Sequence, residues 1–86
     1  MQFEGALIKE QQVVFAVVIV KPFVLDSSSE MSRARKVFSR AFPGVPIILM
    51  AQDGRGVARY QGRRDIVDFL CNVELSRIPW KKYTLN

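Results

Sequence analysis

The sequence VVFAVVIV, which occupies residues 13–20, decides how the rest of the chain can fold. Six of its eight residues are β-branched, and such residues favour an extended strand. Apolar side chains stand at every position, so both faces of the strand are apolar and both have to be covered by other parts of the chain. The run is also far shorter than the roughly 20 apolar residues that a membrane-spanning helix needs. It therefore predicts a strand at the centre of a sheet that is covered on both faces.

A second strand of the same kind is predicted from the sequence VPIILMA, residues 45–51. Between the two runs, Ser27 and Glu30 have the spacing of a capping box, which favours the start of a helix. Apolar residues then recur every three or four positions until about Ala41, and the sequence FPG at residues 42–44 ends the pattern. A helix that connects two strands of one sheet makes them parallel, with a right-handed crossover. We therefore expect the two apolar runs to be adjacent parallel strands.

The remaining elements extend this centre on both sides. Residues 3–8 predict a first strand. The dipeptide Asp53-Gly54 favours a tight turn, and residues 57–61 predict a more polar strand that is suited to a sheet edge. A last helix is expected over residues 63–73, because its apolar side chains cover more than a third of its circumference.

These elements predict a single α/β domain over residues 1–86, with the order ββαββα. The simplest arrangement is a four-stranded mixed sheet in the order 1-2-3-4, with a parallel central pair and one helix on each face. Residues 74–86 are expected to form an irregular C-terminal tail, because Pro79 forbids a regular helix, and Trp80 is expected to cover the core. The predicted centre of the core consists of Phe15, Val17, Ile19, Phe38, Ile47, Leu49, Phe69 and Leu70.

Composition excludes several classes of chemistry. The chain has no histidine, which removes Ser-His and Cys-His catalytic pairs and most zinc sites. Its single cysteine, Cys71, cannot form an internal disulfide or a CxxC pair, and this favours a reducing compartment. No signal peptide is recognisable, because Glu4 lies where a basic start is needed and no cleavage site follows the apolar run. We therefore expect a cytoplasmic protein that is not an enzyme, holds no metal or cofactor and does not associate with membranes.

Positive charge is concentrated in the middle of the chain. Thirteen Lys and Arg against eight Asp and Glu give a net charge of +5, whereas residues 33–64 alone carry +7. On the predicted helix, Arg33, Lys36 and Arg40 fall on one side, opposite the apolar stripe. Such a group binds an anionic partner in some proteins, and in others it is a solvated face that keeps the domain soluble. The candidate anion or partner surface consists of Arg33, Lys36, Arg40, Arg55, Arg59, Arg63 and Arg64.

Residues 45–70 resemble the C-terminal half of a thioredoxin-like domain. In that family a proline opens a strand, a glycine-containing turn leads to its antiparallel partner, and a glycine precedes the last helix. The corresponding residues here are Pro46, Asp53-Gly54 and Gly62. The resemblance implies a cis peptide bond between Val45 and Pro46 that faces bound substrate. The CxxC motif of the redox enzymes is missing, because the corresponding residues 21–25 have the sequence KPFVL, so no redox activity is implied.

The function predicted from the sequence is that of a small interaction or regulatory module, which binds an unidentified protein through its basic surface. The first alternative is nucleic-acid binding through Arg33, Lys36, Arg40 and Arg55. No RNA-recognition aromatic pair, GxxG loop or DNA-reading motif accompanies these charges. The second alternative is a degenerate thioredoxin-like protein without redox activity. The sequence leaves the oligomeric state open.

Overall fold

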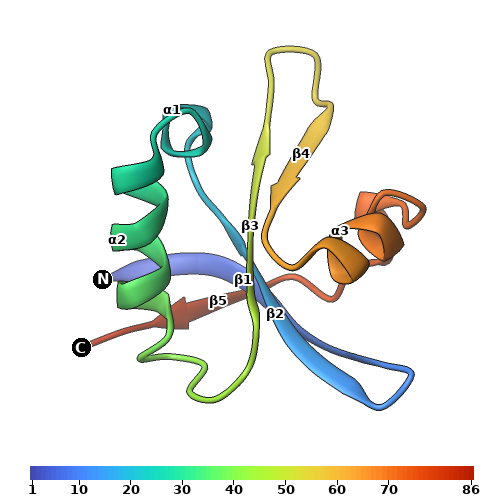
Figure 1. Cartoon of the computed structure of the whole chain (residues 1–86), viewed down its shortest axis with the longest axis horizontal. Coiled ribbons are helices and arrows are strands. Elements are labelled where there is room, and N and C mark those ends of the chain that lie inside the picture. Colours follow the sequence, from blue (N-terminus) through green and yellow to red (C-terminus); the bar gives the residue numbers. More distant parts are fainter.

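The computed structural model describes all 86 residues. Five strands form one mixed sheet in the order β4-β3-β2-β1-β5, with helices on both of its faces (Figure 1). The strands are β1 (Gln2–Glu10), β2 (Val13–Ile19), β3 (Ile47–Gln52), β4 (Ala58–Gln61) and β5 (Lys81–Thr84). The helices are α1 (Pro22–Leu25), α2 (Ser28–Phe38), α3 (Arg64–Leu70) and the short 3-10 helix η1 (Leu75–Arg77). None of these helices is long and apolar enough to cross a membrane.

The two apolar runs form the centre of the sheet. β2 and β3 pair in parallel, with Val18 opposite Leu49, and both of these side chains are fully buried. β1 pairs antiparallel with β2, and β4 pairs antiparallel with β3. Because β2 and β3 are apolar on both faces, their central position allows both faces to be covered. The prediction of two adjacent parallel strands is confirmed.

The C-terminal tail is not irregular, and this overturns the predicted four-stranded sheet. β5 pairs antiparallel with β1 and places Tyr83 opposite Phe3. The rings of these two residues are stacked, with their centroids 5.4 Å apart. Pro79 does prevent a helix in this segment, but β1 would otherwise be an unpaired edge, and a strand from the tail satisfies its backbone groups. The sheet therefore has five strands, with β1 inside it.

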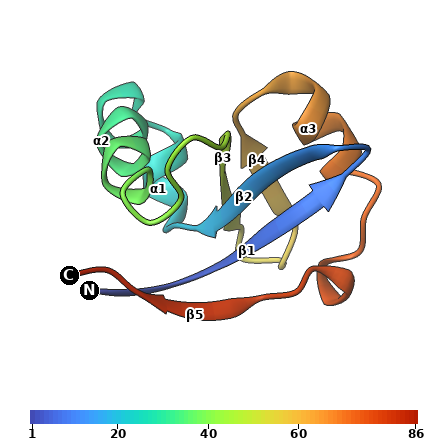
Figure 2. The same cartoon turned by 90° about the horizontal axis from the view of Figure 1, so that it is seen from below.

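The pairing of β1 with β5 continues to residues 1 and 85. The Met1 amino group donates a hydrogen bond to the Leu85 backbone oxygen at 3.1 Å, and the Leu85 N–H donates to the Met1 oxygen at 2.8 Å. Figure 2 shows the two ends of the chain next to each other, beyond the ends of β1 and β5. Residues 1 and 85 are therefore held together by backbone hydrogen bonds that extend the sheet.

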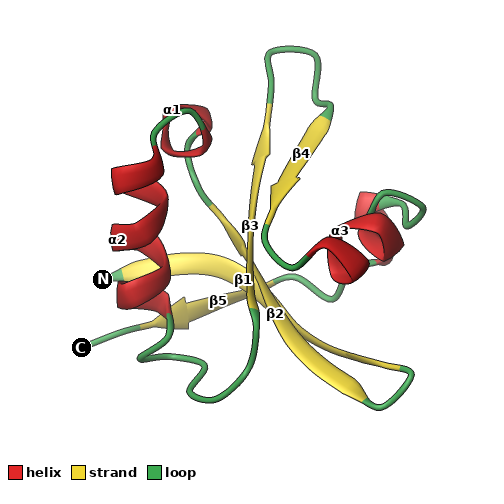
Figure 3. Ribbon diagram, viewed as in Figure 1, coloured by secondary structure: helices red, strands yellow, loops and turns green.

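The prediction of one helix on each face is also wrong, because two helices cover one of the faces. Figure 3 shows α1 and α2 on one side of β3 and α3 on the other. The additional helix is α1, which starts at Pro22, where the missing N–H of proline costs no hydrogen bond. Val24 and Leu25 of α1 are buried in the same core cluster as Leu49. The segment that ends β2 thus contributes to the core.

α2 begins where the capping box predicts. Ser27 is its N-cap, and the Ser27 Oγ accepts a hydrogen bond from the Glu30 N–H at 3.2 Å. The helix ends at Phe38 rather than near Ala41. Pro43 has no N–H to donate to the preceding turn, and proline disfavours the helical conformation in the residue before it. The helix is therefore shorter than predicted, but its last residue, Phe38, is buried against the sheet.

The opposite face of the sheet is covered by α3 together with the residues that precede β5. α3 is shorter than the predicted range of 63–73 and buries Ile66 and Leu70. Trp80 is half-buried against the same core cluster, and its Nε1 donates to the Leu75 backbone oxygen at 3.0 Å. Trp80 therefore covers the core, as predicted.

Six of the eight predicted core side chains are buried. They are Phe15, Val17, Phe38, Ile47, Leu49 and Leu70. Ile19 and Phe69 are only half-buried, and each lines a hollow in the protein surface. The sequence thus predicts the centre of the core correctly but not its borders.

The structure contains no cis peptide bond. The cis bond between Val45 and Pro46, which the resemblance to thioredoxin-like domains implies, is therefore absent. Pro46 lies half-buried immediately before β3, and its backbone oxygen accepts a hydrogen bond from the Ala16 N–H at 2.9 Å. Pro46 thus extends the backbone pairing of β2 with β3 by one hydrogen bond.

Candidate partner-binding surface

The seven predicted surface cations are all exposed, but they come from separate parts of the fold. Arg33 and Lys36 lie on α2, Arg40 lies shortly after it, Arg55 lies in the turn between β3 and β4, Arg59 lies on β4, and Arg63 and Arg64 lie at the start of α3. In Figure 1 the β3–β4 turn is at the top, whereas α2 ends well below it, and α3 lies on the other side of β3. The cations are therefore divided between the two faces of the sheet.

Two of these cations are engaged by carboxylates. Arg63 donates two hydrogen bonds to Asp65, from Nε at 2.8 Å and from a terminal guanidinium nitrogen at 2.9 Å. These hydrogen bonds lower the pKa of the Asp65 carboxyl and raise the pKa of Arg63. Arg59 donates to the carboxylate of Asp26, which follows α1, at 3.1 Å. The charge of both guanidinium groups is thus locally balanced.

No side-chain carboxylate lies within hydrogen-bond distance of the cations on and after α2. The distance from Arg33 Nη1 to Glu30 Oε1 is 3.6 Å, longer than a charge-assisted hydrogen bond. Arg40 donates to the backbone oxygen of Asn86 at 2.7 Å. Lys36 forms no ion pair. Arg55 and Arg64 form no ion pair either, so the positive charge that is available to a partner lies on α2, in the β3–β4 turn and at the start of α3.

An apolar groove of about 390 Å³, which Arg33 also lines, lies between α1 and α2, and we call it the α1–α2 groove. It is bounded by α1, by α2 and by the ends of β1 and β2 next to these helices. Nine of its 13 lining residues are hydrophobic, among them Phe3 from β1, Phe23 from α1 and Val37 from α2. The groove thus opens at the carboxyl end of β2, a position where α/β proteins commonly bind their ligands.

Phe23 leaves a large aromatic surface of this groove in solvent. Its exposed fraction is 59%, and that of Met1, which also lines the groove, is 60%. The exposure of Phe23 has a local cause, because α1 has only four residues and its buried positions are taken by Val24 and Leu25. Removing such a surface from water is favourable by roughly 25 cal/mol per Å². A partner that covered Phe23 would gain this free energy.

The charged residues of the groove are Lys21, Glu30 and Arg33. Lys21 immediately precedes α1, and Arg33 lies three residues after Glu30 on α2. Two cations against one carboxylate leave the groove with a net positive charge. Charge complementarity therefore favours a ligand that combines apolar surface with negative charge.

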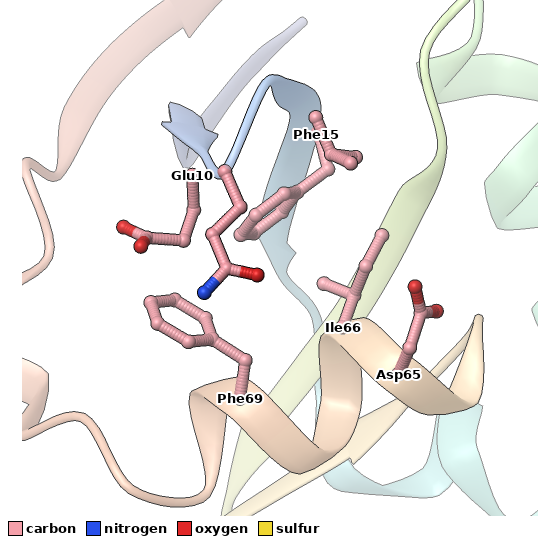
Figure 4. A pocket seen from close by; sticks show the side chains of 7 residues that line it. Glu10, Phe15, Asp65, Ile66 and Phe69 are labelled. Atoms are coloured by element: carbon pink, nitrogen blue, oxygen red, sulfur yellow. The ribbon is translucent and has the colours of Figure 1, made fainter.

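A second, smaller pocket of about 170 Å³ lies on the opposite face, between the β1–β2 hairpin and α3. Figure 4 shows Ile66 and Phe69 of α3 facing Phe15, with Glu10 and Asp65 on either side. The Phe15 and Phe69 rings meet edge to face, with their centroids 6.4 Å apart. Because Asp65 is already bound by Arg63, and because Phe15 and Ile66 are buried, this pocket offers a partner little free surface. The α1–α2 groove is the better candidate site.

Among the sequence-based candidates, only Arg33 lines the groove. Lys21 and Phe23 lie in the KPFVL segment, which attracts attention in the sequence only because it lacks a CxxC motif. Pro22 is a signal for a helix start, since proline is favoured in the first turn. A helix of four residues is nevertheless too short to show a period, so the exposure of Phe23 could not be predicted from the sequence.

Comparison with protein-family models, with curated proteins and with solved structures found no match to this chain. The relation to thioredoxin-like domains is not tested by these comparisons and stays a prediction.

Proposed function

We propose that this protein is a non-enzymatic interaction module that binds an acidic segment of a partner protein in the α1–α2 groove. The observation that carries the proposal is the exposure of Phe23 beside a groove with nine hydrophobic lining residues. Contiguous exposed apolar surface marks binding sites in soluble proteins, and buried aromatic side chains supply much of the binding energy of protein interfaces. Phe23 is the aromatic anchor of this surface.

The charge around the groove supports an acidic occupant. Lys21 and Arg33 line the groove, and Lys36 and Arg40 follow along and after α2. Cations at the rim of an apolar surface attract an acidic partner during encounter and disfavour basic partners. The partner segment should therefore carry apolar side chains for the groove and carboxylates for its rim.

The residue types of the groove support binding rather than catalysis. Its only carboxylate, Glu30, faces Arg33 at 3.6 Å, and the groove contains no Ser, Thr or Cys that could act as a nucleophile. The chain has no histidine to activate one. The side chains that remain are apolar or cationic, and these hold a ligand without transforming it.

The alternative of nucleic-acid binding has less support from the arrangement of the cations. Of its four candidate residues, Arg33 and Lys36 share α2, but Arg55 lies in the exposed β3–β4 turn at a different end of the molecule (Figure 1). A phosphate backbone would have to span both places. Binding through phosphates also falls steeply with salt, which provides a clear test.

The proposed function is tested by selecting a phage-displayed random peptide library on the purified protein. We expect the selected peptides to combine apolar residues with Asp or Glu. Phe23→Ser should weaken their binding by at least about 30-fold, as expected for a residue that anchors an interface. The matched control is Val57→Ser, because Val57 has a similar exposed fraction of 57% but lies outside the groove. Failure to select any peptide, or equal losses in the two variants, would overturn the proposal.

Fluorescence anisotropy with single-stranded and duplex oligonucleotides tests the alternative. We expect weak binding that has nearly disappeared when the salt concentration rises from about 50 to about 200 mM. Micromolar affinity at the higher concentration, lost when Arg33, Lys36, Arg40 and Arg55 are replaced by Ala, would instead establish nucleic-acid binding.

A further inference from the structure

Glu30 and Arg33 form the only ion pair inside the α1–α2 groove. They lie three residues apart on α2, with 3.6 Å between Arg33 Nη1 and Glu30 Oε1. The Arg33 side chain is 74% exposed and that of Glu30 is 35% exposed. Exposed pairs of this kind add little stability, because water screens them and both side chains lose freedom. Arg33 can therefore leave Glu30 at little cost.

The two members of this pair differ in mobility. Glu30 belongs to the first turn of α2, where the Ser27 cap fixes its backbone and the helix dipole favours its negative charge. Arg33 has a longer side chain, and its guanidinium can form a paired hydrogen bond with any carboxylate that reaches it. A change of partner would therefore move Arg33 and leave Glu30 in place.

We infer that Glu30 is a built-in competitor, which occupies Arg33 until a carboxylate of the bound segment replaces it. This inference rests on the proposed function, and it adds a mechanism that regulates binding in the groove. In the free protein, Glu30 contacts the cation that the partner needs. In the complex, Arg33 contacts the partner's carboxylate, beside the apolar side chain that covers Phe23. The pair therefore lowers affinity for acidic segments and makes binding depend on Arg33.

The inference predicts that removal of Glu30 strengthens binding. Glu30→Gln keeps the size of the side chain and its capping-box capacity but removes the competing charge. We expect it to bind a selected acidic peptide about two- to fivefold more tightly, the range that an exposed ion pair supplies. Arg33→Gln should weaken binding of the same peptide, and Glu30→Gln should bring no gain in a protein that already carries Arg33→Gln.

The measurement is fluorescence anisotropy with one selected peptide and with a version in which its acidic residues are replaced by Asn or Gln. The neutral peptide should bind wild type and Glu30→Gln equally. Equal gains for both peptides, or no gain for the acidic one while Phe23→Ser still abolishes binding, would overturn the inference and leave the proposed function standing. If neither peptide binds any of these proteins, both are overturned. Circular dichroism and thermal unfolding of each variant show that α2 is intact.

Discussion

The two faces of the sheet are covered in different ways. The face under α2 is closed by two helices and by an aromatic cluster in which Phe3 contacts Phe38, Phe42 and Tyr83. The other face is covered by the seven residues of α3, and the chain returns with η1 and Trp80 to complete the cover. The second face is closed by the tail, whereas the first is left with the larger hollow. The face that more helices cover is therefore also the face with the larger groove for a partner.

The largest expected effects come from two neighbouring side chains of β3. Ile48 and Leu49 point to opposite faces, and neither has any exposed surface. We expect Ile48→Ala and Leu49→Ala each to lower the free energy of unfolding by about 2–5 kcal/mol, because each leaves a cavity in a packed core. Urea unfolding measures both, with Val57→Ala at an exposed position as the control. If one variant were as stable as wild type, that face would not be part of the cooperative core.

A smaller effect is expected at the start of α2. Ser27 caps this helix through its side chain, whereas the residue before α3, Arg63, makes no such cap. Ser27→Ala should lower the free energy of unfolding by about 1 kcal/mol, within the range of roughly 0.5–2 kcal/mol for lost N-caps. Ser28→Ala is the matched control, because the Ser28 side chain forms no hydrogen bond. Equal urea midpoints for the two variants would show that the cap does not stabilise the fold.

The smallest effect concerns the start of α3. Hydrogen bonds from Arg63 lower the pKa of Asp65 in the folded protein, so this contact stabilises the fold above the unfolded pKa of Asp65. This contribution to stability is lost as the pH falls through the lower pKa that Asp65 has in the folded protein. An NMR titration of the carboxyl carbons should show the pKa of Asp65 rising in Arg63→Gln and unchanged in Arg64→Gln, the neighbouring control. An unchanged pKa in Arg63→Gln would exclude Arg63 as the cause.

The sequence predicts the centre of the fold because its signals there are local and repeated. Two long runs that are apolar on both faces, joined by a capped helix, leave few arrangements other than a parallel pair. β5 has no such signal, since it has four residues and begins with Lys81 and Lys82. Its position depends on the open edge of β1 and on the stacking of Tyr83 against Phe3, which become visible only in the folded chain.

Less of the candidate site could be predicted, because its geometry depends on contacts that no local sequence signal encodes. The exposure of the cations could be predicted from their polarity, but their hydrogen-bond partners could not. Arg59 finds Asp26 at a separation of 33 residues, and Arg40 finds Asn86 at a separation of 46 residues. Phe23 is exposed because of the short length of α1, and no apolar period encodes this. Contacts between distant residues and the direction of single side chains thus limit what the sequence reveals.

The hydrogen bonds between Met1 and Leu85 make the backbone nearly a closed ring. A linker of a few residues would join the two ends at a small entropic cost, and the exposed β3–β4 turn, residues 53–57, offers a place for new ends. In such a circular permutant, β5 and β1 would follow one another as a hairpin. Their pairing would change from the contact most distant along the chain to a local one. The β3–β4 pairing, which is now local, would in turn join the two new ends of the chain and become the most distant one. The permutant therefore exchanges one closing pair of strands for another, and we expect it to keep the same native structure without folding faster.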